Sequence, residues 1–380
     1  MVFLLICGNN KLMLHSLLIK IRSFDWLLFL PVIFLVLLSL AELYSVGLGQ
    51  AAGDLSFFKR QLIFSIIGLV LLCLLAARDY YFLYSYSNLI YLLGVLSLVA
   101  VLFFGSTING TKGWFNFFGF GIQPVEAVKY VLIVFLSRYL AGTSTLINPL
   151  RNLLVTGSAT ALLAFLVMLQ PDFGSASLLI FIWLFALFVS GLPKKFFLII
   201  LSLMIVSAIL AWQFFLADYQ KDRVLNFVRP SAELNSNYNV NQAMIAIGAG
   251  GLFGRGLGFG SQSQLKFLPE AKTDFIFAVI AEELGLIGVL LVISLFSLFF
   301  WRLFKNLANI KNDFSSFLVI CSGGLIFIEM FINIGMNLGL VPVVGIALPF
   351  LSYGGSSLII NLAMVGALQS VVARSKLKQY

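Results

Sequence analysis

The sequence predicts an all-α integral membrane protein with about ten transmembrane helices, and three observations support this fold class. Hydrophobic residues make up 61% of the chain and charged residues only 10%, which lies far outside the range of soluble globular proteins. Apolar runs close to the roughly 20 residues that a helix needs to cross a bilayer recur along the 380 residues. The strict apolar alternation of a membrane β-barrel is absent from the sequence.

The predicted elements follow the apolar runs in chain order. Residues 1–24 are expected to form a cytoplasmic N-terminal tail, because basic residues precede the first run and no convincing cleavage site follows. Either Met1 or Met13 could be the start of this tail. The runs are residues 27–46, 61–77, 88–104, 124–141, 152–169, 174–191, 193–217, 274–301, 317–337 and 356–373.

Local signals justify several of these boundaries. Pro124 suits the first turn of the fourth run, where its missing N–H does no harm. Asp172 is well placed to cap the sixth run, which begins directly after it. The segment 105–123 is rich in glycine, and we expect a loop there. A much longer loop, 217–273, separates the seventh and eighth runs; it has aromatic and apolar content, so we expect it to be ordered.

The distribution of Lys and Arg predicts the orientation of the chain. With ten runs, both termini lie on one side, and that side holds most of the cations of the short loops. The positive-inside rule therefore places both termini in the cytoplasm and loop 217–273 outside. We expect a single membrane domain over residues 25–373, followed by a basic cytoplasmic tail over 374–380.

Cysteine and histidine usage excludes several kinds of site. Cys7, Cys73 and Cys321 lie in apolar surroundings without C-x-x-C spacing, so neither a disulfide nor a zinc site is expected. The single histidine, His15, lies in the N-terminal tail, which argues against catalysis by imidazole. Chemistry in this chain would have to use carboxylates and cations.

Asp274 is the predicted centre of the functional site. It lies where the charged loop ends and a long apolar run begins, so an ionised carboxylate there carries a desolvation cost that a function would offset. The alternative is that Asp274 only caps the helix of the eighth run.

Outward-facing cations could complement an anionic ligand such as a pyrophosphate. Lys112, Arg223, Arg255 and Lys272 are among them, although contact with anionic lipid headgroups would also explain each one. The glycine-rich stretch 249–260 could be a phosphate cradle or a tightly turning re-entrant loop with close backbone packing. It lacks the spacing and the βαβ context of a dinucleotide fingerprint.

Several charged residues are predicted to lie inside the membrane. Glu126 and Lys129 are one helical turn apart in the fourth run, and a structural ion pair is one interpretation. Glu282, Glu283 and Glu329 need partners or water, so a proton or ion path is another hypothesis, although the sequence pairs none of them specifically.

Several motifs together resemble the SEDS family (shape, elongation, division and sporulation), which includes RodA and FtsW. The resemblance extends from about Asp25 to the C-terminus in unbroken order. The segments that carry it are 123–126 (Gln-Pro-Val-Glu) with Lys129, 170–174 (Gln-Pro-Asp-Phe-Gly), 268–278 (Leu-Pro-Glu-Ala-Lys-Thr-Asp-Phe-Ile-Phe-Ala), 282–285 (Glu-Glu-Leu-Gly) and 349–357 (Pro-Phe-Leu-Ser-Tyr-Gly-Gly-Ser-Ser).

This resemblance implies a glycosyltransferase of the cytoplasmic membrane that polymerises lipid II into peptidoglycan outside that membrane, together with a class B penicillin-binding protein that crosslinks the strands. It also implies that Asp274 is the essential catalytic residue, and it favours substrate contacts by Lys112 and Arg223. We further expect membrane lipids and the elongation or division machinery as partners, and no nucleic acid. The full set of expected substrate-binding residues is Lys112, Trp114, Glu126, Lys129, Asp172, Arg223, Arg255, Glu270 and Lys272.

The chemistry of glycan extension agrees with these expectations. A carboxylate can take the proton of an attacking sugar hydroxyl, while cations stabilise the departing pyrophosphate. A divalent ion, Mg²⁺ or Mn²⁺, could assist, and no other cofactor is expected. The segment 333–345 resembles the RodA branch more than the FtsW branch. The alternatives are a lipid II flippase that uses Glu126, Lys129, Glu282 and Glu329 as a polar path, or a scaffold that only anchors the penicillin-binding protein.

Overall fold

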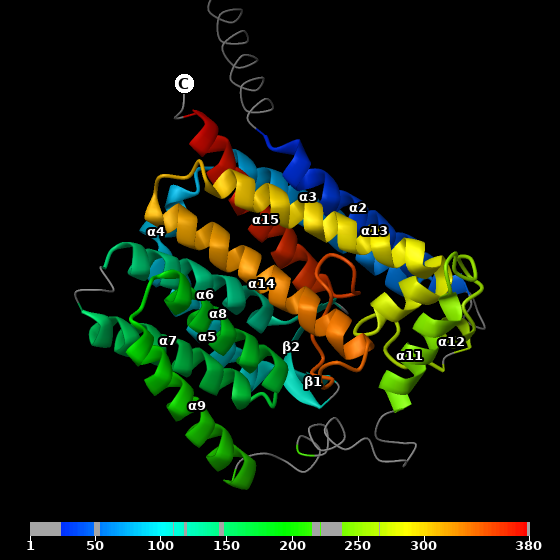
Figure 1. Ribbon diagram of the computed structural model, residues 1–380, viewed down its shortest axis with the longest axis horizontal. Coiled ribbons are helices and arrows are strands. Elements are labelled where there is room, and N and C mark those ends of the chain that lie inside the picture. Colours follow the sequence, from blue (N-terminus) through cyan, green and yellow to red (C-terminus); the bar gives the residue numbers. More distant parts are fainter. Residues whose placement is uncertain are drawn as a thin grey trace, which may run out of the picture.

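The structure is a computed structural model, and it describes residues 24–48, 54–108, 110–117, 120–143, 148–214, 221, 238–265 and 267–377. Helices dominate it and run side by side along the molecule (Figure 1). Each of the ten predicted apolar runs contains a helix: α2 (Trp26–Leu48), α3 (Ser56–Ala77), α5 (Ser87–Phe104), α6 (Pro124–Ala141), α7 (Pro149–Met168), α8 (Phe173–Val189), α9 (Lys194–Phe214), α13 (Ile276–Leu307), α14 (Asp313–Asn337) and α15 (Gly355–Leu377).

Within the described residues, seven helices are long and apolar enough to cross a membrane, namely α2, α3, α5, α7, α13, α14 and α15. Helix α8 is apolar but shorter. Helix α6 carries Glu126, Lys129 and Arg138 within its 18 residues, and these charges lower its hydropathy. The chain is therefore a multi-pass membrane protein. Three shorter helices also occur among the described residues: α4 (Tyr81–Ser85), α11 (Tyr238–Gly250) and α12 (Ser261–Gln264).

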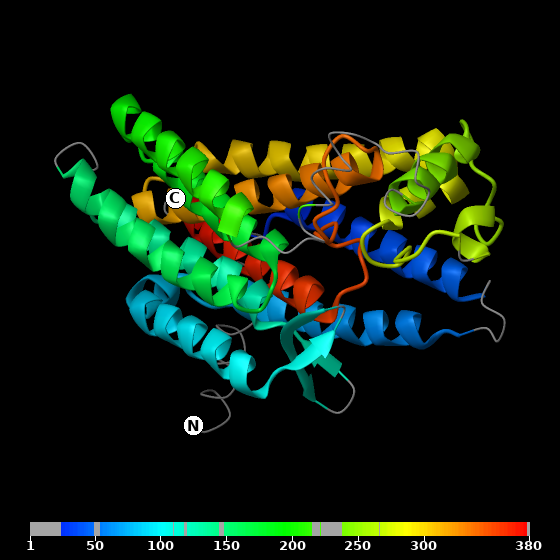
Figure 2. The ribbon, with the colours of Figure 1, turned by 90° about the horizontal axis from the view of Figure 1, so that it is seen from below.

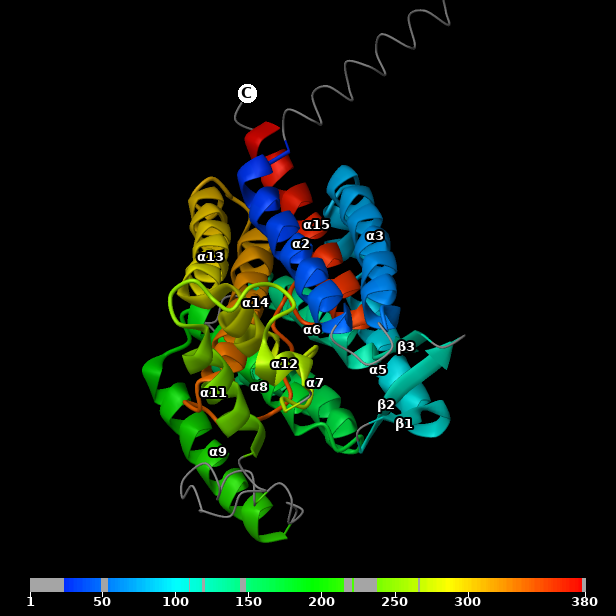
Figure 3. The same cartoon turned by 90° about the vertical axis from the view of Figure 1, so that its right-hand side faces the viewer.

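Helix α15 lies at the centre of the bundle, between α2 and α3 in the view of Figure 3. Most of its membrane-spanning stretch is buried inside the protein. Two glycines let α15 and α3 approach closely: a Cβ on Gly366 would lie 2.5 Å from the carbonyl oxygen of Leu72, and one on Gly68 would lie 2.5 Å from Leu362 Cδ1. Close packing through small residues is a common way for helices to associate in a bilayer.

A small antiparallel sheet, with strand order β1-β2-β3, stands at the end of α5 (Figure 2). Its strands are β1 (Ser106–Ile108), β2 (Thr111–Phe117) and β3 (Phe120–Ile122). We expected a loop over 105–123, and the expectation was wrong for these residues. The glycine at position 110 has φ +81°, which allows the tight turn from β1 to β2, and the β-branched and aromatic residues that follow favour strands.

Helix α13 is broken in its N-terminal third, although the sequence predicted one continuous run. Gly285 has φ 65° and ψ −158°, a conformation that only glycine adopts easily. The break leaves backbone groups without helical partners, and the glycine-rich loop supplies them. Leu286 N–H donates to the carbonyl of Gly251 at 2.9 Å, and the Glu283 carbonyl accepts from Gly256 N–H at 2.9 Å. The loop therefore completes the hydrogen bonding of the broken helix.

Asp25 joins three helices at the opposite end of the bundle. Its carboxylate accepts hydrogen bonds from Arg302 Nε at 2.8 Å, Asn306 Nδ2 at 3.0 Å and Lys376 Nζ at 2.9 Å. Its backbone N–H and carbonyl pair with the side-chain amide of Gln369. Burial by itself would raise the pKa of Asp25, but hydrogen bonds from Arg302, Lys376 and Asn306 lower it to about 2.

Candidate functional site

Asp274 is held by its backbone between α13 and α14. The carbonyl of Asp274 accepts hydrogen bonds from Asn333 Nδ2 and Asn337 Nδ2, both at 3.0 Å. Helix α13 begins two residues later, and Phe275 occupies the N-cap position. Asp274 thus precedes the cap residue, and its half-buried side chain borders Gly345, where an added Cβ would lie 3.7 Å from Asp274 Oδ2.

The 349–357 motif ties the segment before α13 to the rest of the site. Ser352 Oγ donates to the carbonyl of Thr273 at 2.6 Å, and Tyr353 N–H donates to the carbonyl of Lys272 at 2.8 Å. Farther along the same motif, Ser356 Oγ accepts from Gln123 N–H at 2.9 Å. One segment therefore fixes both the backbone beside Asp274 and the residue that precedes α6.

Asp172 caps α8, as the sequence predicted. Its carboxylate accepts from Ser175 N–H at 2.9 Å and from Ser175 Oγ at 2.7 Å. Gln123 Nε2 also donates to it, at 3.3 Å. An added Cβ on Gly174 would lie 2.5 Å from the carbonyl oxygen of Val344. The neighbour of Val344 in the chain, Gly345, borders Asp274, so the two aspartates flank the same stretch of loop 338–354.

The predicted ion pair between Glu126 and Lys129 is confirmed, and it has a third member. Lys129 Nζ lies 3.0 Å from Glu126 Oε2 and also bonds Glu329 Oε1. Both Lys129 and Glu329 are buried. Glu329 lies one helical turn before Asn333, the residue that bonds the Asp274 carbonyl. The triad of Glu126, Lys129 and Glu329 is therefore connected to the Asp274 segment through α14.

Two predicted outer residues lie on β2. Lys112 is exposed, whereas Trp114 is half-buried and packs against Gly121, where an added Cβ would be 3.1 Å from its ring. No described hydrogen bond or ion pair links either side chain to Asp274. Arg223, the other outer cation that the resemblance favours, lies outside the described residues.

Glu270, Lys272 and Arg255 make local contacts. Glu270 has φ 53° and accepts a hydrogen bond from Thr273 Oγ1 at 2.8 Å. The ammonium of Lys272 lies 3.8 Å from the centre of the Phe57 ring, so α3 positions it beside the Asp274 segment. Arg255 is exposed, and its guanidinium donates to Ser261 Oγ at 2.9 Å.

The glycine-rich loop has the close backbone packing that was one of its two interpretations. Arg255 N–H donates to the carbonyl of Glu282 at 3.0 Å, and Gly258 N–H donates to the carboxylate of Glu283 at 3.2 Å. A Cβ on Gly260 would lie 2.7 Å from Glu282 Oε2. These amides already have protein acceptors, so this stretch does not present them to a phosphate.

The four residues of the hypothetical flippase path fall into two groups. Lys129 joins Glu126 to Glu329, whereas Glu282 accepts from backbone N–H groups of the glycine-rich loop. Over the described ranges, no hydrogen bond or ion pair joins the two groups. Sequence reasoning missed the pairing of Glu329 with Lys129, because nothing in the sequence shows that α6 and α14 pack together.

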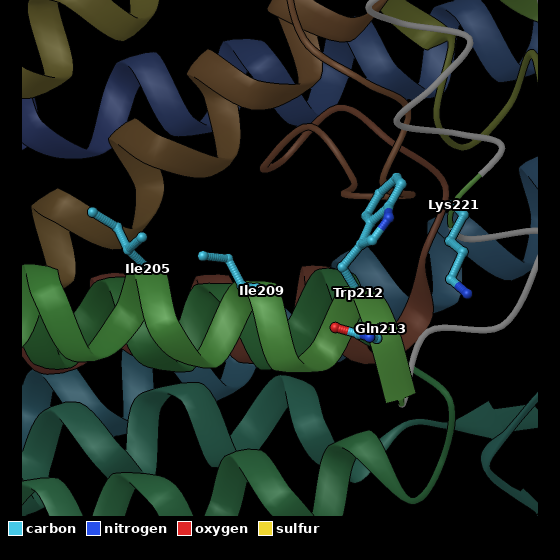
Figure 4. A pocket seen from close by; sticks show the side chains of 5 residues that line it. All are labelled: Ile205, Ile209, Trp212, Gln213 and Lys221. Atoms are coloured by element: carbon cyan, nitrogen blue, oxygen red, sulfur yellow. The ribbon is translucent and has the colours of Figure 1, made fainter.

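A cavity of about 630 Å³ opens beside α9 (Figure 4). Ile205, Ile209 and Trp212 form its apolar wall, and Gln213 and Lys221 lie at one end. Helix α9 lies at the edge of the bundle (Figure 1), and most of its described apolar side chains are exposed. The cavity therefore has an apolar wall and a polar end.

Comparisons with known proteins place the chain in one family. The family model described as cell cycle protein, FtsW/RodA/SpoVE, matches residues 20–377. The peptidoglycan glycosyltransferase MrdB of Escherichia coli K12 is 36% identical over 357 residues, which cover 91% of this chain and 94% of MrdB. Stage V sporulation protein E of Bacillus subtilis is 36% identical and covers 94% of this chain and 99% of its own. FtsW of Coxiella burnetii is 36% identical and covers 82% and 85%.

Solved structures agree with this assignment. A chain from a peptidoglycan synthase complex, solved in work on the coordination of polymerization and crosslinking, aligns with a TM-score of 0.77 and 29% identity, covering 93% of this chain and 98% of that one. The rod shape determining protein RodA of Thermus thermophilus aligns with a TM-score of 0.68 and 29% identity, covering 92% and 97%. The chain belongs to the FtsW/RodA/SpoVE family, the SEDS family that its motifs resemble.

Proposed function

We propose that this protein is a peptidoglycan glycosyltransferase that extends glycan strands from lipid II on the outer face of the cytoplasmic membrane. The names of its relatives support the reaction class. The observation that carries the assignment of the site is the placement of Asp274. Asn333, Asn337 and Ser352 fix the backbone around a half-buried carboxylate that borders a glycine. Such an arrangement holds a base in place while leaving room for substrate.

The proposed reaction is a displacement at the anomeric carbon of one lipid-linked sugar. The 4-hydroxyl of the other substrate attacks that carbon and forms the new glycosidic bond, while the bond to the lipid pyrophosphate breaks. Asp274 takes the hydroxyl proton, and the pyrophosphate leaves with the bonding electrons. A single displacement of this kind inverts the configuration at the anomeric carbon.

The negative charge on the departing pyrophosphate needs cationic partners. We propose Lys272 as one of them, because α3 holds its ammonium close to the Asp274 segment. Lys112, Arg223 and Arg255 are proposed as further outer contacts, with Trp114 and Glu270 at the edge of the substrate. Asp172, Glu126 and Lys129 are proposed to shape the inner side of the same site, since they connect to it through loop 338–354 and α14.

A divalent cation would fit this site only with help from the substrate. The described residues include no group of three or more His, Cys, Asp or Glu side chains that could hold a metal ion. Magnesium is often held by one or two carboxylates plus substrate phosphates, so Asp274 together with a pyrophosphate would suffice. When bound, such an ion would neutralise charge on the leaving group.

We propose that the cavity beside α9 receives the lipid part of the substrate. The apolar wall of Ile205, Ile209 and Trp212 suits an isoprenoid chain, and Lys221 at one end of the cavity suits a phosphate. Helix α9 would then let the lipid reach the site from the side, without leaving the bilayer.

We propose ten membrane-spanning helices with both termini in the cytoplasm and loop 217–273 outside. A class B penicillin-binding protein is the proposed partner, consistent with a structural neighbour that belongs to a complex coordinating polymerization and crosslinking. Segment 333–345 favours the RodA branch, although relatives named MrdB and FtsW are equally similar at 36% identity.

The direct test of this function is polymerisation of labelled lipid II by the purified protein with its penicillin-binding partner in liposomes. Glycan strands longer than the starting disaccharide are the expected product. If the protein instead moves lipid II between leaflets and makes no polymer, the proposal fails in favour of a flippase. If it does neither, a scaffold role takes its place.

A further inference from the structure

Glu42 is a buried carboxyl group that the sequence analysis did not single out. It lies in α2, a membrane-spanning helix, and none of its surface is exposed. Both of its side-chain oxygens are buried and lack a hydrogen-bond donor. An isolated carboxylate in such surroundings would be strongly destabilising, so Glu42 needs a neutralising group.

The neighbouring carboxyl group belongs to Glu283 of α13. Unlike the carboxyl group of Glu42, it has hydrogen-bond donors around it. Glu283 is also fully buried, but it accepts hydrogen bonds from Ser45 Oγ at 2.5 Å, Gln264 Nε2 at 3.0 Å and Gly258 N–H at 3.2 Å. Ser263 Oγ also lies within hydrogen-bond distance, at 3.4 Å, and such donors stabilise an ionised carboxylate. Ser45 lies one helical turn from Glu42 on the same helix, so both residues of α2 face the same group.

Other charged groups nearby have partners of their own. The carboxylate of Glu282 accepts from Gln262 N–H at 2.8 Å and Ser263 N–H at 3.1 Å. The guanidinium of Arg255 is directed to Ser261. Arg255 has no described contact with Glu42, and Glu282 is itself acidic, so neither residue neutralises Glu42.

Two buried carboxylates in contact cannot both stay ionised without a cation between them. A metal ion would need further oxygen ligands, and no group of three or more His, Cys, Asp or Glu side chains that could hold one occurs in the described ranges. We propose that Glu42 and Glu283 form a proton-binding site, in which protonated Glu42 donates its O–H to the carboxylate of Glu283.

The retained proton has a structural role. It lets Glu283 remain an acceptor for Gly258 and Gln264, and these two residues fix the glycine-rich loop against the break in α13. The same loop leads along the chain to Lys272 and Asp274. Glu42 is therefore a positioning residue that acts through Glu283, and the proposal does not depend on the reaction that Asp274 performs.

Infrared difference spectroscopy tests the proposal directly on the full-length protein in detergent at neutral pH. Wild type minus Glu42→Gln should show the C=O stretching band of one protonated carboxyl group, and this band should shift in D₂O. Absence of the band would overturn the proposal. The matched control is Glu270→Gln, which changes an exposed carboxylate and should give no such band.

Thermal unfolding provides the second measurement. Glu42→Gln keeps a donor toward Glu283, so its Tm should stay close to that of wild type, whereas Glu42→Ala should melt a few degrees lower. If Glu42→Gln melts as low as Glu42→Ala, the shared proton is contradicted. If the Tm of wild type, but not of Glu42→Gln, rises with added Na⁺ or Mg²⁺, a metal cation occupies the site instead.

Discussion

At the scale of single residues, the sequence identified the candidate site residues more readily than the residues that they contact. Asp274 stood out because a charged residue at the start of a membrane run is costly unless it has a role. The amides of Asn333 and Asn337 that hold its backbone come from α14, about 60 residues later. No local signal connects the two segments, so this part of the site required the structure.

Glu42 illustrates the same limit. In the sequence it is one acidic residue in an apolar run. Only the packing of α2 against α13 shows that it meets a second carboxyl group and has no donor. The sequence likewise did not predict the ion pair of Glu329 with Lys129, whereas helical spacing predicted the ion pair of Lys129 with Glu126.

The triad makes a prediction about stability. Lys129→Met would leave Glu126 and Glu329 together without their cation, at a cost of roughly 3–5 kcal/mol, so the Tm in detergent should fall clearly. Adding Glu329→Gln should recover part of the loss, because it removes the uncompensated charge. The exposed Lys112→Met serves as the control and should leave the Tm unchanged; an equal loss there would contradict the account.

At the scale of elements, most helices were predictable because apolar runs and membrane thickness determine where they lie. The strands β1 to β3 and the break in α13 were not. The turn between β1 and β2 and the break in α13 both depend on glycines with positive φ, Gly110 and Gly285, and this φ is a property of the folded backbone. A glycine in the sequence indicates that such a conformation is available, but it does not show that the chain uses it.

The break in α13 predicts that position 285 tolerates only glycine. A Cβ there would overlap the amide nitrogen of Gly254, and φ is 65°. Gly285→Ala should therefore lower the Tm by an amount that corresponds to at least 1–3 kcal/mol. Gly248→Ala in α11 is the matched control, because a Cβ there meets nothing within 4 Å. A Gly285→Ala protein as stable as the control would contradict the observed break.

The junction of α2, α13 and α15 at Asp25 predicts a dependence of stability on pH. The pKa of Asp25 is about 2 in the folded protein, below the ordinary value of 3.8 for an aspartate side chain. Its ionised form therefore stabilises the fold above pH 3.8 by roughly 1–2 kcal/mol, and this contribution is lost as the pH falls toward 2.

Asp25→Asn should consequently melt at a lower temperature than wild type at pH 6, and the difference should shrink as the pH approaches 2. Thermal melts of both proteins over this pH range measure it. A difference that stays constant with pH would show that the charge of Asp25 does not contribute.

At the scale of the whole molecule, the bundle brings four motifs that are far apart in the sequence to one site. The segment before α13, the 349–357 motif, the start of α6 and the cap of α8 are joined by hydrogen bonds or by contact with loop 338–354. The sequence order of the motifs predicted the family, and the structure shows how they meet.

The proposed orientation can be tested on intact cells. In a background with Cys7, Cys73 and Cys321 changed to serine, a membrane-impermeant thiol reagent should label Lys112→Cys and Arg255→Cys. It should reach Lys305→Cys and Lys376→Cys only after the membrane is opened. The reverse pattern would place the Asp274 segment on the cytoplasmic side and exclude polymerisation outside.

The central claim is that Asp274 is the base of a glycan polymerase. The most direct measurement compares lipid II polymerisation by wild type, Asp274→Asn and Asp274→Ala, each purified with the penicillin-binding partner and shown by its melting curve to be folded. We predict that both variants lose activity by at least 10²-fold, the usual scale for removing a general base. Polymerisation at the wild-type rate by folded Asp274→Ala would contradict the claim.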